Sequence, residues 1–228
     1  MFQGKMKAVT FSYDDGVTQD KRLIEIFNRY GLKGTFNLNS GKFDEDYYAP
    51  SGEVRYKIRA HEVKSVYEGH EIAAHTITHT NLTNLNQKEV IREAEEDRLA
   101  LEWLLGYPVV GLAYPCGGVN NDDRVAEILR KHTKIRYGRT TTPTYGFDKQ
   151  TDLYRFNPTI HHSDWDEFER LTDEFLSAEP EKPMLFYIWG HSYEFDFDDS
   201  WSRMENVGRE LANRNDVFYG TNRQVFGL

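Results

Sequence analysis

The chain has 228 residues, of which 39% are hydrophobic and 29% charged, and its formal net charge is −9. This length supplies the core of one sizeable domain, and the acidic balance argues against nucleic acid or an anionic membrane as a partner. The single cysteine excludes a disulfide within the chain and is more typical of a reducing compartment. We therefore expect one domain over residues 1–228.

No stretch reaches the length of a membrane span, and the N-terminus lacks the basic-then-apolar pattern of a signal peptide. As the chain is given, we expect a cytoplasmic protein. A secreted protein is the alternative if a leader was removed. Nothing in the sequence indicates an oligomeric state.

The first strong element is an apolar run that ends in Asp14, Asp15 and Gly16. Its β-branched and aromatic residues predict a strand, and the glycine predicts an abrupt turn. Adjacent carboxylates repel each other, but a metal ion resolves that conflict because one can bind the ion while the other handles protons. An exposed Asp-Asp-Gly turn is the alternative interpretation of this stretch.

A second apolar run leads into His75 and His79, and a third, over residues 184–190, leads into His191. The spacing of four places both imidazoles of the pair on one side of the backbone. Imidazole together with carboxylate suits zinc and other late divalent ions. Three separate strands are thus predicted to end in residues that bind metals or transfer protons.

Strand-like and helix-like segments alternate along the chain, which is typical of an α/β fold with parallel strands. The patterns predict strands over residues 9–14, 33–38, 70–75, 109–114, 134–140, 156–160, 184–191 and 216–221. They predict helices over residues 18–30, 61–67, 86–105, 121–131, 164–178 and 199–213, and a long loop at 43–59. We expect an irregular (β/α) barrel of about seven parallel strands, TIM-like, with its active site at the C-terminal strand ends.

These motifs resemble those of the polysaccharide deacetylases of the NodB-homology type, carbohydrate esterase family 4. The family's Thr-Phe-Asp-Asp-Gly motif is similar to residues 12–16, and its His-Ser/Thr-x-x-His motif is matched by residues 75–79. Its Arg-x-Pro-Tyr-Gly motif is half matched by residues 113–117, and Leu-x-Leu-His is loosely matched by the run into His191. The motifs stand in the family's order and spacing.

The resemblance implies a metal-dependent hydrolase that removes acetyl groups from N-acetylated or O-acetylated carbohydrate. Asp15, His75 and His79 would bind one divalent ion (zinc, or else cobalt, nickel or manganese) that activates the attacking water. Asp14 would be the general base, and His191 the general acid that protonates the leaving nitrogen.

The half-matched third motif implies substrate contacts from Tyr114, Pro115 and Cys116. In the family a backbone N–H of this motif binds the oxyanion, and that donor corresponds to Cys116 here. A thiol nucleophile at Cys116 is an alternative to the metal chemistry.

The chain departs from the family at three places. Ala113 stands where the family's arginine pairs with the general base, and we predict that Arg139 replaces it. Gly190 stands where the family has leucine, which predicts a wider or reshaped acetyl pocket. The fourth motif has only a tentative match at Asp164 and Trp165, where the tryptophan would line the pocket or else simply begin the core face of a helix.

Other interpretations stay open at this point. His161 and His162 follow a predicted strand, and we expect a structural or exposed pair rather than a substrate contact. The missing arginine allows a catalytically impaired, carbohydrate-binding barrel. Metal-dependent hydrolysis of a small non-sugar amide is a third possibility.

Overall fold

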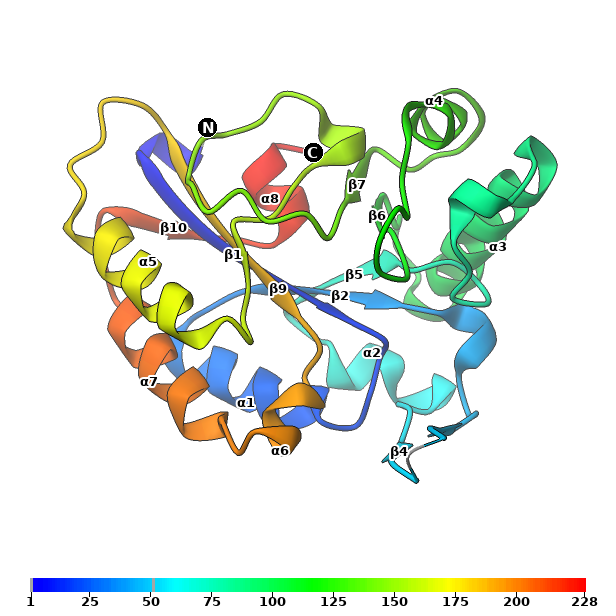
Figure 1. Ribbon diagram of the computed structural model, residues 1–228, viewed down its shortest axis with the longest axis horizontal. Coiled ribbons are helices and arrows are strands. Elements are labelled where there is room, and N and C mark those ends of the chain that lie inside the picture. Colours follow the sequence, from blue (N-terminus) through cyan, green and yellow to red (C-terminus); the bar gives the residue numbers. More distant parts are fainter. Residues whose placement is uncertain (1, 51) are drawn as a thin grey trace.

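The computed structural model describes residues 2–50 and 52–228. In this part of the chain, eight parallel strands form one curled sheet in the order β7-β6-β5-β2-β1-β9-β8, and β10 also pairs with β1 (Figure 1). The strands are β1 (Lys7–Asp14), β2 (Gly34–Leu38), β5 (Glu71–Ala74), β6 (Gly111–Ala113), β7 (Tyr137–Arg139), β8 (Ile160–His161), β9 (Met184–Gly190) and β10 (Val217–Tyr219). The predicted irregular α/β barrel is thereby confirmed.

Strand β1 lies at the centre of this sheet. It pairs with β9 from Lys7 to Tyr13, and on its other side with β10 first and with β2 further along. The sheet curls until the segment before β8 reaches β7, where Phe156 bridges to Arg139. All the strands run parallel, so their carboxyl ends meet at one edge of the curled sheet.

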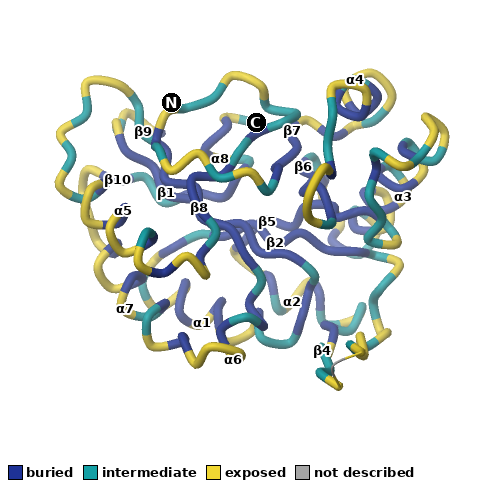
Figure 2. Tube along the Cα trace, viewed as in Figure 1, coloured by how far each residue is buried: buried dark blue, intermediate teal, exposed yellow. Residues whose placement is uncertain are grey.

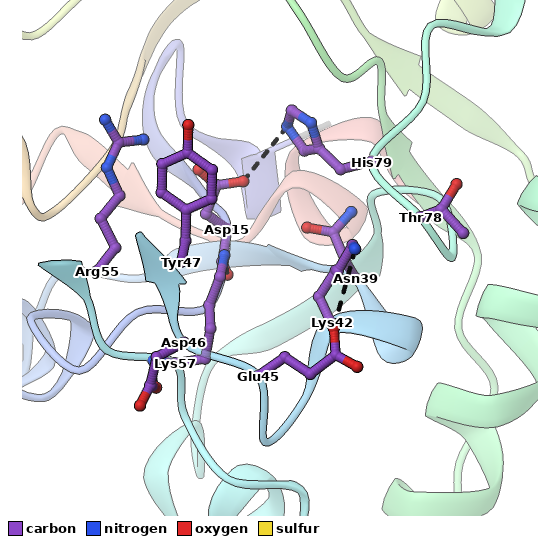
Figure 3. Close-up of a pocket in the computed structure, with 10 residues that line it drawn as sticks. All are labelled: Asp15, Asn39, Lys42, Glu45, Asp46, Tyr47, Arg55, Lys57, Thr78 and His79. Carbon is purple, nitrogen blue, oxygen red and sulfur yellow. Dashed lines mark hydrogen bonds and ion pairs between the residues drawn. The ribbon is translucent and has the colours of Figure 1, made fainter. Parts of the chain in front are cut away.

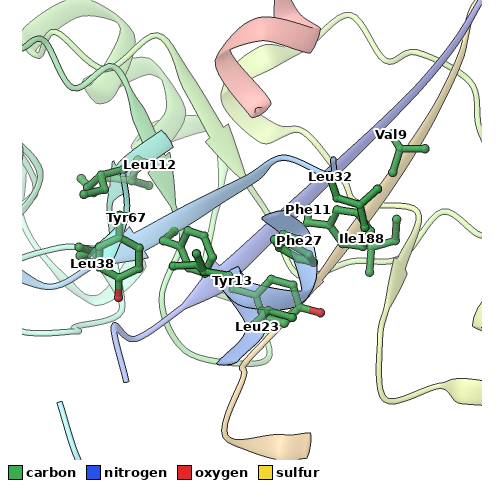
Figure 4. Close-up of a cluster of buried hydrophobic side chains, with 14 of the residues drawn as sticks. Val9, Phe11, Tyr13, Leu23, Phe27, Leu32, Leu38, Tyr67, Leu112 and Ile188 are labelled. Atoms are coloured by element: carbon green, nitrogen blue, oxygen red, sulfur yellow. The ribbon is translucent and has the colours of Figure 1, made fainter. Parts of the chain in front are cut away.

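Successive side chains along β1 point alternately to the outer and the inner face of the curled sheet. Phe11 and Tyr13 point outward into the main apolar core, where Phe11 packs against Phe27 of helix α1 (Figure 4). Thr10 and Ser12 point to the inside of the curl, where both contact Asn222. The next residue of the inward series is Asp14, at the strand's end.

The outer helices cover the sheet and leave the strands buried, as the exposure map shows (Figure 2). They are α1 (Asp20–Tyr30), α2 (Val63–Val66), α3 (Gln87–Leu105), α4 (Asp123–His132), α5 (Trp165–Ser177), α6 (Glu194–Phe197) and α7 (Trp201–Leu211). Helix α3 begins with the predicted capping box of Asn86 and Glu89. Helix α1 ends at Gly31, whose φ of 67° is left-handed.

Helix α8 (Asn222–Phe226), which the sequence pattern did not predict, lies against β1 inside the curl. The Asn222 N–H donates to Thr35 Oγ1, and the Arg223 N–H donates to the buried carboxylate of Glu71. Hydrogen-bonding side chains on the inner faces of the strands thus hold the helix that fills this end of the barrel.

The predicted loop over residues 43–59 carries a short antiparallel hairpin, β3 (Tyr47–Tyr48) with β4 (Val54–Arg55). The hairpin lies below the carboxyl edge of the sheet in Figure 1. None of the described helices is long and apolar enough to cross a membrane.

Candidate active site

Four predicted site residues lie at or shortly after the ends of β1 and β5. Asp14 is the last residue of β1, and the chain then turns through Asp15 and Gly16 with φ values of 81° and 61°. His75 follows β5, and His79 lies four residues further on with a φ of 57°. Left-handed backbone at non-glycine residues is uncommon and gathers at functional sites.

The structure brings Asp15, His75 and His79 together. Oδ1 of Asp15 lies 3.4 Å from Nε2 of His79 and 3.9 Å from Nε2 of His75 (Figure 3 shows Asp15 facing His79). One ligand atom from each of the three residues lies within 4.8 Å of the others. Asp14 stands beside them, with Oδ2 3.8 Å from Nε2 of His75.

This donor set fits a divalent cation. Nδ1 of His75 lies 2.8 Å from the carbonyl oxygen of Ala113, so Nδ1–H donates there and the lone pair of Nε2 faces the aspartates. Burial lowers the pKa of His75 to about 4, so the ring is neutral at pH 7, as a ligand must be. Ligands about 2.1 Å from a tetrahedral zinc lie about 3.4 Å from one another, which the Asp15–His79 spacing matches.

Helix α3 holds the segment that carries both histidines. Asp97 accepts a hydrogen bond of 2.9 Å from the backbone N–H of His75, and Glu93 accepts one of 3.0 Å from that of Thr78. Both carboxylates are buried, and burial raises the pKa of Asp97 to about 7. Side chains of the long helix α3 therefore hold the backbone of the segment that carries the histidine pair.

Asp14 is bound from two sides. Arg139 donates to both of its carboxylate oxygens, at 2.5 Å from Oδ1, and Asn37 donates to Oδ1 at 2.7 Å. The guanidinium of Arg139 is fully buried and lies 4.5 Å from the ring centre of Trp189. The structure thus places Arg139 against the predicted general base.

Both aspartates are ionised at neutral pH. Burial acts to raise the pKa of Asp14, but the charge of Arg139 outweighs it and the net shift is downward. Burial also acts to raise the pKa of Asp15, and here the charges of Lys57 and His191 outweigh it and lower the pKa. Asp15 can thus bind a cation, and Asp14 can accept a proton.

His191 follows β9 and contacts Glu194, which the sequence pattern did not single out. Nδ1 of His191 lies 3.1 Å from Oε1 of Glu194, and the His191 N–H donates to Oε2 of the same carboxylate. Burial acts to lower the pKa of His191, but the hydrogen bond with Glu194 and the nearby aspartates outweigh it and raise the pKa. A protonated imidazole is thereby favoured beside the aspartates.

A cavity of about 400 Å³ opens at Asp15 and His79. Its remaining wall comes mainly from the hairpin and the segments beside it, including Lys42, Tyr47 and Arg55 (Figure 3). Nζ of Lys57 donates to the backbone carbonyl of Asp15 at 2.6 Å, which ties this segment to the turn after β1. The loop predicted at 43–59 thus forms one side of the site's mouth.

The third-motif residues lie at the end of β6, but their side chains differ in position. Tyr114 is fully buried and its hydroxyl donates to the carbonyl of Tyr154, so this side chain does not reach the cavity. Pro115 is buried as well. Cys116 is partly exposed, with a φ of 69° and Sγ 3.7 Å from the carbonyl oxygen of His79.

Trp165 lies away from the cavity at the start of α5. It is 7% exposed, its Nε1–H donates to Asp198, and its ring packs on Phe168 and Phe195. The preceding Asp164 is exposed. The carboxylate that contacts His191 is instead that of Glu194, three residues further along the chain.

Sequence reasoning missed the buried carboxylates that support the site. The buried stripe of α3 runs through Val90, Ala94 and Leu101, and Glu93 and Asp97 stand in that stripe where apolar residues are expected. A charged residue on the buried face of a helix is a signal that could have identified both. Glu194 carries only the weaker signal of its His-x-x-Glu spacing.

Comparisons with known proteins give the family and the fold. Residues 3–135 match the family model described as polysaccharide deacetylase, and a search of curated protein sequences found no match. The peptidoglycan deacetylase PdaC from Bacillus subtilis is 16% identical, with 97% of this chain and 91% of that chain covered and a TM-score of 0.58.

Two further solved structures share the fold. The family 4 carbohydrate esterase from Streptomyces lividans, in complex with acetate, is 16% identical over 95% of this chain and 93% of that chain, with a TM-score of 0.58. The Xyl-CE4 domain of a multidomain xylanase from the hindgut metagenome of Trinervitermes trinervoides is 16% identical over 97% and 90%, with a TM-score of 0.60.

Fold and family model together define an enzyme of the α/β-barrel hydrolase class. The chain belongs to the polysaccharide deacetylase family, because the matched region covers more than half of its 228 residues. The resemblance predicted from the motifs is confirmed. The family acts on acetylated carbohydrate.

Proposed function

We propose that this chain is one catalytic domain, residues 1–228, that hydrolyses acetyl groups from N-acetylated or O-acetylated carbohydrate with the help of one divalent cation. The observation that carries the proposal is that the two neighbouring aspartates make different contacts. Asp15 lies near both His75 and His79, whereas Asp14 lies near His75 but has both of its oxygens hydrogen-bonded to Arg139. One carboxylate is thus available for a cation and the other for a proton.

In this proposal Asp15, His75 and His79 hold the cation, with zinc the best match to two imidazoles and one carboxylate. A divalent cation bound there lowers the pKa of water and polarises the acetyl carbonyl. The cavity at Asp15 and His79 gives the substrate access to the same side of these ligands.

Asp14 takes up the proton of the attacking water. Its lowered pKa keeps it ionised, and its hydrogen bonds with Arg139 and Asn37 fix the direction of its lone pairs. Arg139 therefore acts as a positioning residue for the base.

His191 supplies the proton to the leaving amine or alcohol. Glu194 accepts from Nδ1–H, which leaves Nε2–H to face the substrate, and the raised pKa keeps the ring protonated nearer to neutrality. The Cys116 N–H makes no hydrogen bond within residues 2–50 and 52–228, so it is free to donate to the oxyanion.

The test is acetate release from N-acetylglucosamine oligomers and from acetylated xylan, with the protein stripped by a chelator and then reloaded with zinc or cobalt. We expect release only after reloading, and loss of release in Asp14→Asn with metal content unchanged. The matched variant Asp15→Asn should lose both metal and release. No release from either substrate with any divalent ion would contradict the proposal and favour the impaired, carbohydrate-binding barrel.

A further inference from the structure

A second cluster of side chains of the kinds that bind metals lies at the carboxyl ends of β8 and β9. It consists of His161, His162 and Glu194, and one ligand atom from each lies within 4.8 Å of the others. Oε2 of Glu194 is 3.4 Å from Nε2 of His161 and also 3.4 Å from Nε2 of His162. The cluster shares no residue with the site formed by Asp15, His75 and His79.

The spacing in this cluster suits coordination better than hydrogen bonding. Hydrogen bonds from N–H to oxygen have donor–acceptor distances of about 2.7–3.2 Å. Two ligands of a tetrahedral ion, each about 2.1 Å from it, lie about 3.4 Å apart. Both histidine–glutamate distances have this second value, as does the distance between Asp15 and His79.

His162 provides an independent observation. Its ring is fully buried between Tyr13 and Phe195, with ring centres 5.5 Å and 4.3 Å away. Neither of its nitrogens has a hydrogen-bond partner among residues 2–50 and 52–228, and Nε2 is the one directed at Glu194. An unpartnered buried imidazole is costly, and a cation at Nε2 would supply the missing interaction.

Gly190 makes room for this ring. A Cβ at position 190 would lie 1.9 Å from Nδ1 and 2.4 Å from Cε1 of His162, so any larger residue would displace the imidazole. This glycine predicts a wider or reshaped pocket, and the space that a side chain at position 190 would occupy is filled by His162. The φ of Gly190 is not left-handed, so glycine is needed here for space and not for backbone conformation.

We propose that His161, His162 and Glu194 bind a second divalent cation, of the zinc type. Two imidazoles and one carboxylate are a known ligand set for zinc and leave one position open. Oε1 of the same glutamate accepts from Nδ1 of His191. The second ion would thus fix the carboxylate that orients His191, and the inference stands whether or not the first site acts as proposed.

The competing arrangement has no ion. His161 Nδ1 accepts from the Ser163 N–H at 3.2 Å, so without an ion Nε2 carries the ring hydrogen and directs it at Glu194. Glu194 would then be a hydrogen-bond acceptor shared by three histidines. A cation at Nε2 requires the other tautomer, in which Nδ1–H donates to the Ser163 hydroxyl 2.7 Å away. The number of bound ions separates these two arrangements.

The experiment counts ions per chain after dialysis against a zinc buffer, by mass spectrometry, and repeats the count with cobalt by its visible absorption. We expect two ions in the unaltered protein, one in His79→Gln, one in His161→Gln and none in the double variant. Gly190→Ala, which retains every ligand but displaces the His162 ring, should also lose one ion. The control His132→Gln, on the exposed side of α4, should keep two.

A single ion in the unaltered protein that disappears only in His79→Gln would overturn the proposal. Two ions that persist in both His161→Gln and Gly190→Ala would overturn it as well. Two ions of which His161→Gln loses one, with His79→Gln unchanged, would support the second site and contradict the first. Thermal unfolding of each variant confirms that the chain is folded during the count.

Discussion

Arg139 and Ala113 are register partners on neighbouring strands, and the side chain of Arg139 binds Asp14 across the mouth of the barrel. The family motif would place its arginine at position 113. In this chain the guanidinium comes from the adjacent strand, β7, and still reaches both carboxylate oxygens of Asp14. The guanidinium thus reaches the proposed base from the strand next to the one that the family motif uses.

Replacing Arg139 by alanine should lower turnover by roughly 100-fold or more, because the base loses its orientation and its counter-ion. Metal content should not change, since Arg139 contacts none of the three proposed ligands. Acetate release and metal analysis on the same sample measure both effects. Arg139→Lys retains the charge without the paired hydrogen bonds and should be intermediate.

The register pairing offers a rescue. The double variant Ala113→Arg/Arg139→Ala returns the guanidinium to the strand where the family motif has it, and should regain part of the lost turnover. Removing one partner of a buried pair also destabilises by about 3–5 kcal/mol, so unfolding curves must accompany the assay. Normal turnover in Arg139→Ala would show that Asp14 needs no such partner.

Much of this fold could be predicted from the sequence because its signals are local. The alternation before Asp14 predicts a strand, and the Asn86–Glu89 capping box places the start of α3 at the residue observed. The contact of Arg139 with Asp14 could be predicted as well, because the carboxyl ends of parallel strands share one edge of the sheet.

The remaining parts depend on contacts between distant segments. The position of His162 follows from the absence of a side chain at Gly190, which only the packing of β8 on β9 reveals. The contact of Glu194 with His191 requires the turn into α6, and Trp165 faces the core although the sequence allowed either side. No hydrophobic periodicity in the sequence predicts the short helix α8 or its position inside the barrel.

Cys116 should prove dispensable for catalysis. Burial and the charge of Asp15 both raise the pKa of its thiol, which disfavours the thiolate, and its sulfur lies near a carbonyl oxygen rather than a histidine nitrogen. Cys116→Ser should therefore retain turnover close to that of the unaltered protein. A loss as deep as that of Asp14→Asn would instead favour the thiol nucleophile.

Asp20 should make the stability of the protein depend on pH. Its buried carboxyl accepts from the hydroxyls of Ser192 and Tyr67, each at 2.6 Å, and burial raises its pKa to about 7. The folded state therefore holds a proton that the unfolded chain releases above about pH 4. The free energy of unfolding should fall as pH rises from about 4 to about 7, by up to about 1.4 kcal/mol per pH unit.

Asp20→Asn removes this titration. The difference between the two proteins in how the free energy of unfolding changes with pH therefore reports Asp20 and not the other buried acids. Urea unfolding of both proteins at several pH values, with chelator present to exclude metal binding, measures the two slopes. The unaltered protein should lose stability relative to the variant over this range and run parallel to it above pH 7. Equal slopes throughout would mean that Asp20 is already ionised in the folded state at low pH.

Gly111→Ala should destabilise the interior of the barrel. A Cβ there would lie 2.1 Å from the ring of Tyr137, the register partner of Gly111 on β7. That ring is fully buried, and its hydroxyl donates to Glu71 at 2.9 Å, so it cannot move aside without breaking a buried hydrogen bond. We expect the free energy of unfolding to fall by about 1–3 kcal/mol.

The matched control is Gly117→Ala, whose added Cβ has no atom within 4 Å, and it should change the free energy of unfolding by less than about 0.5 kcal/mol. Equal unfolding curves for the two variants would mean that β6 and β7 can separate to admit the methyl group.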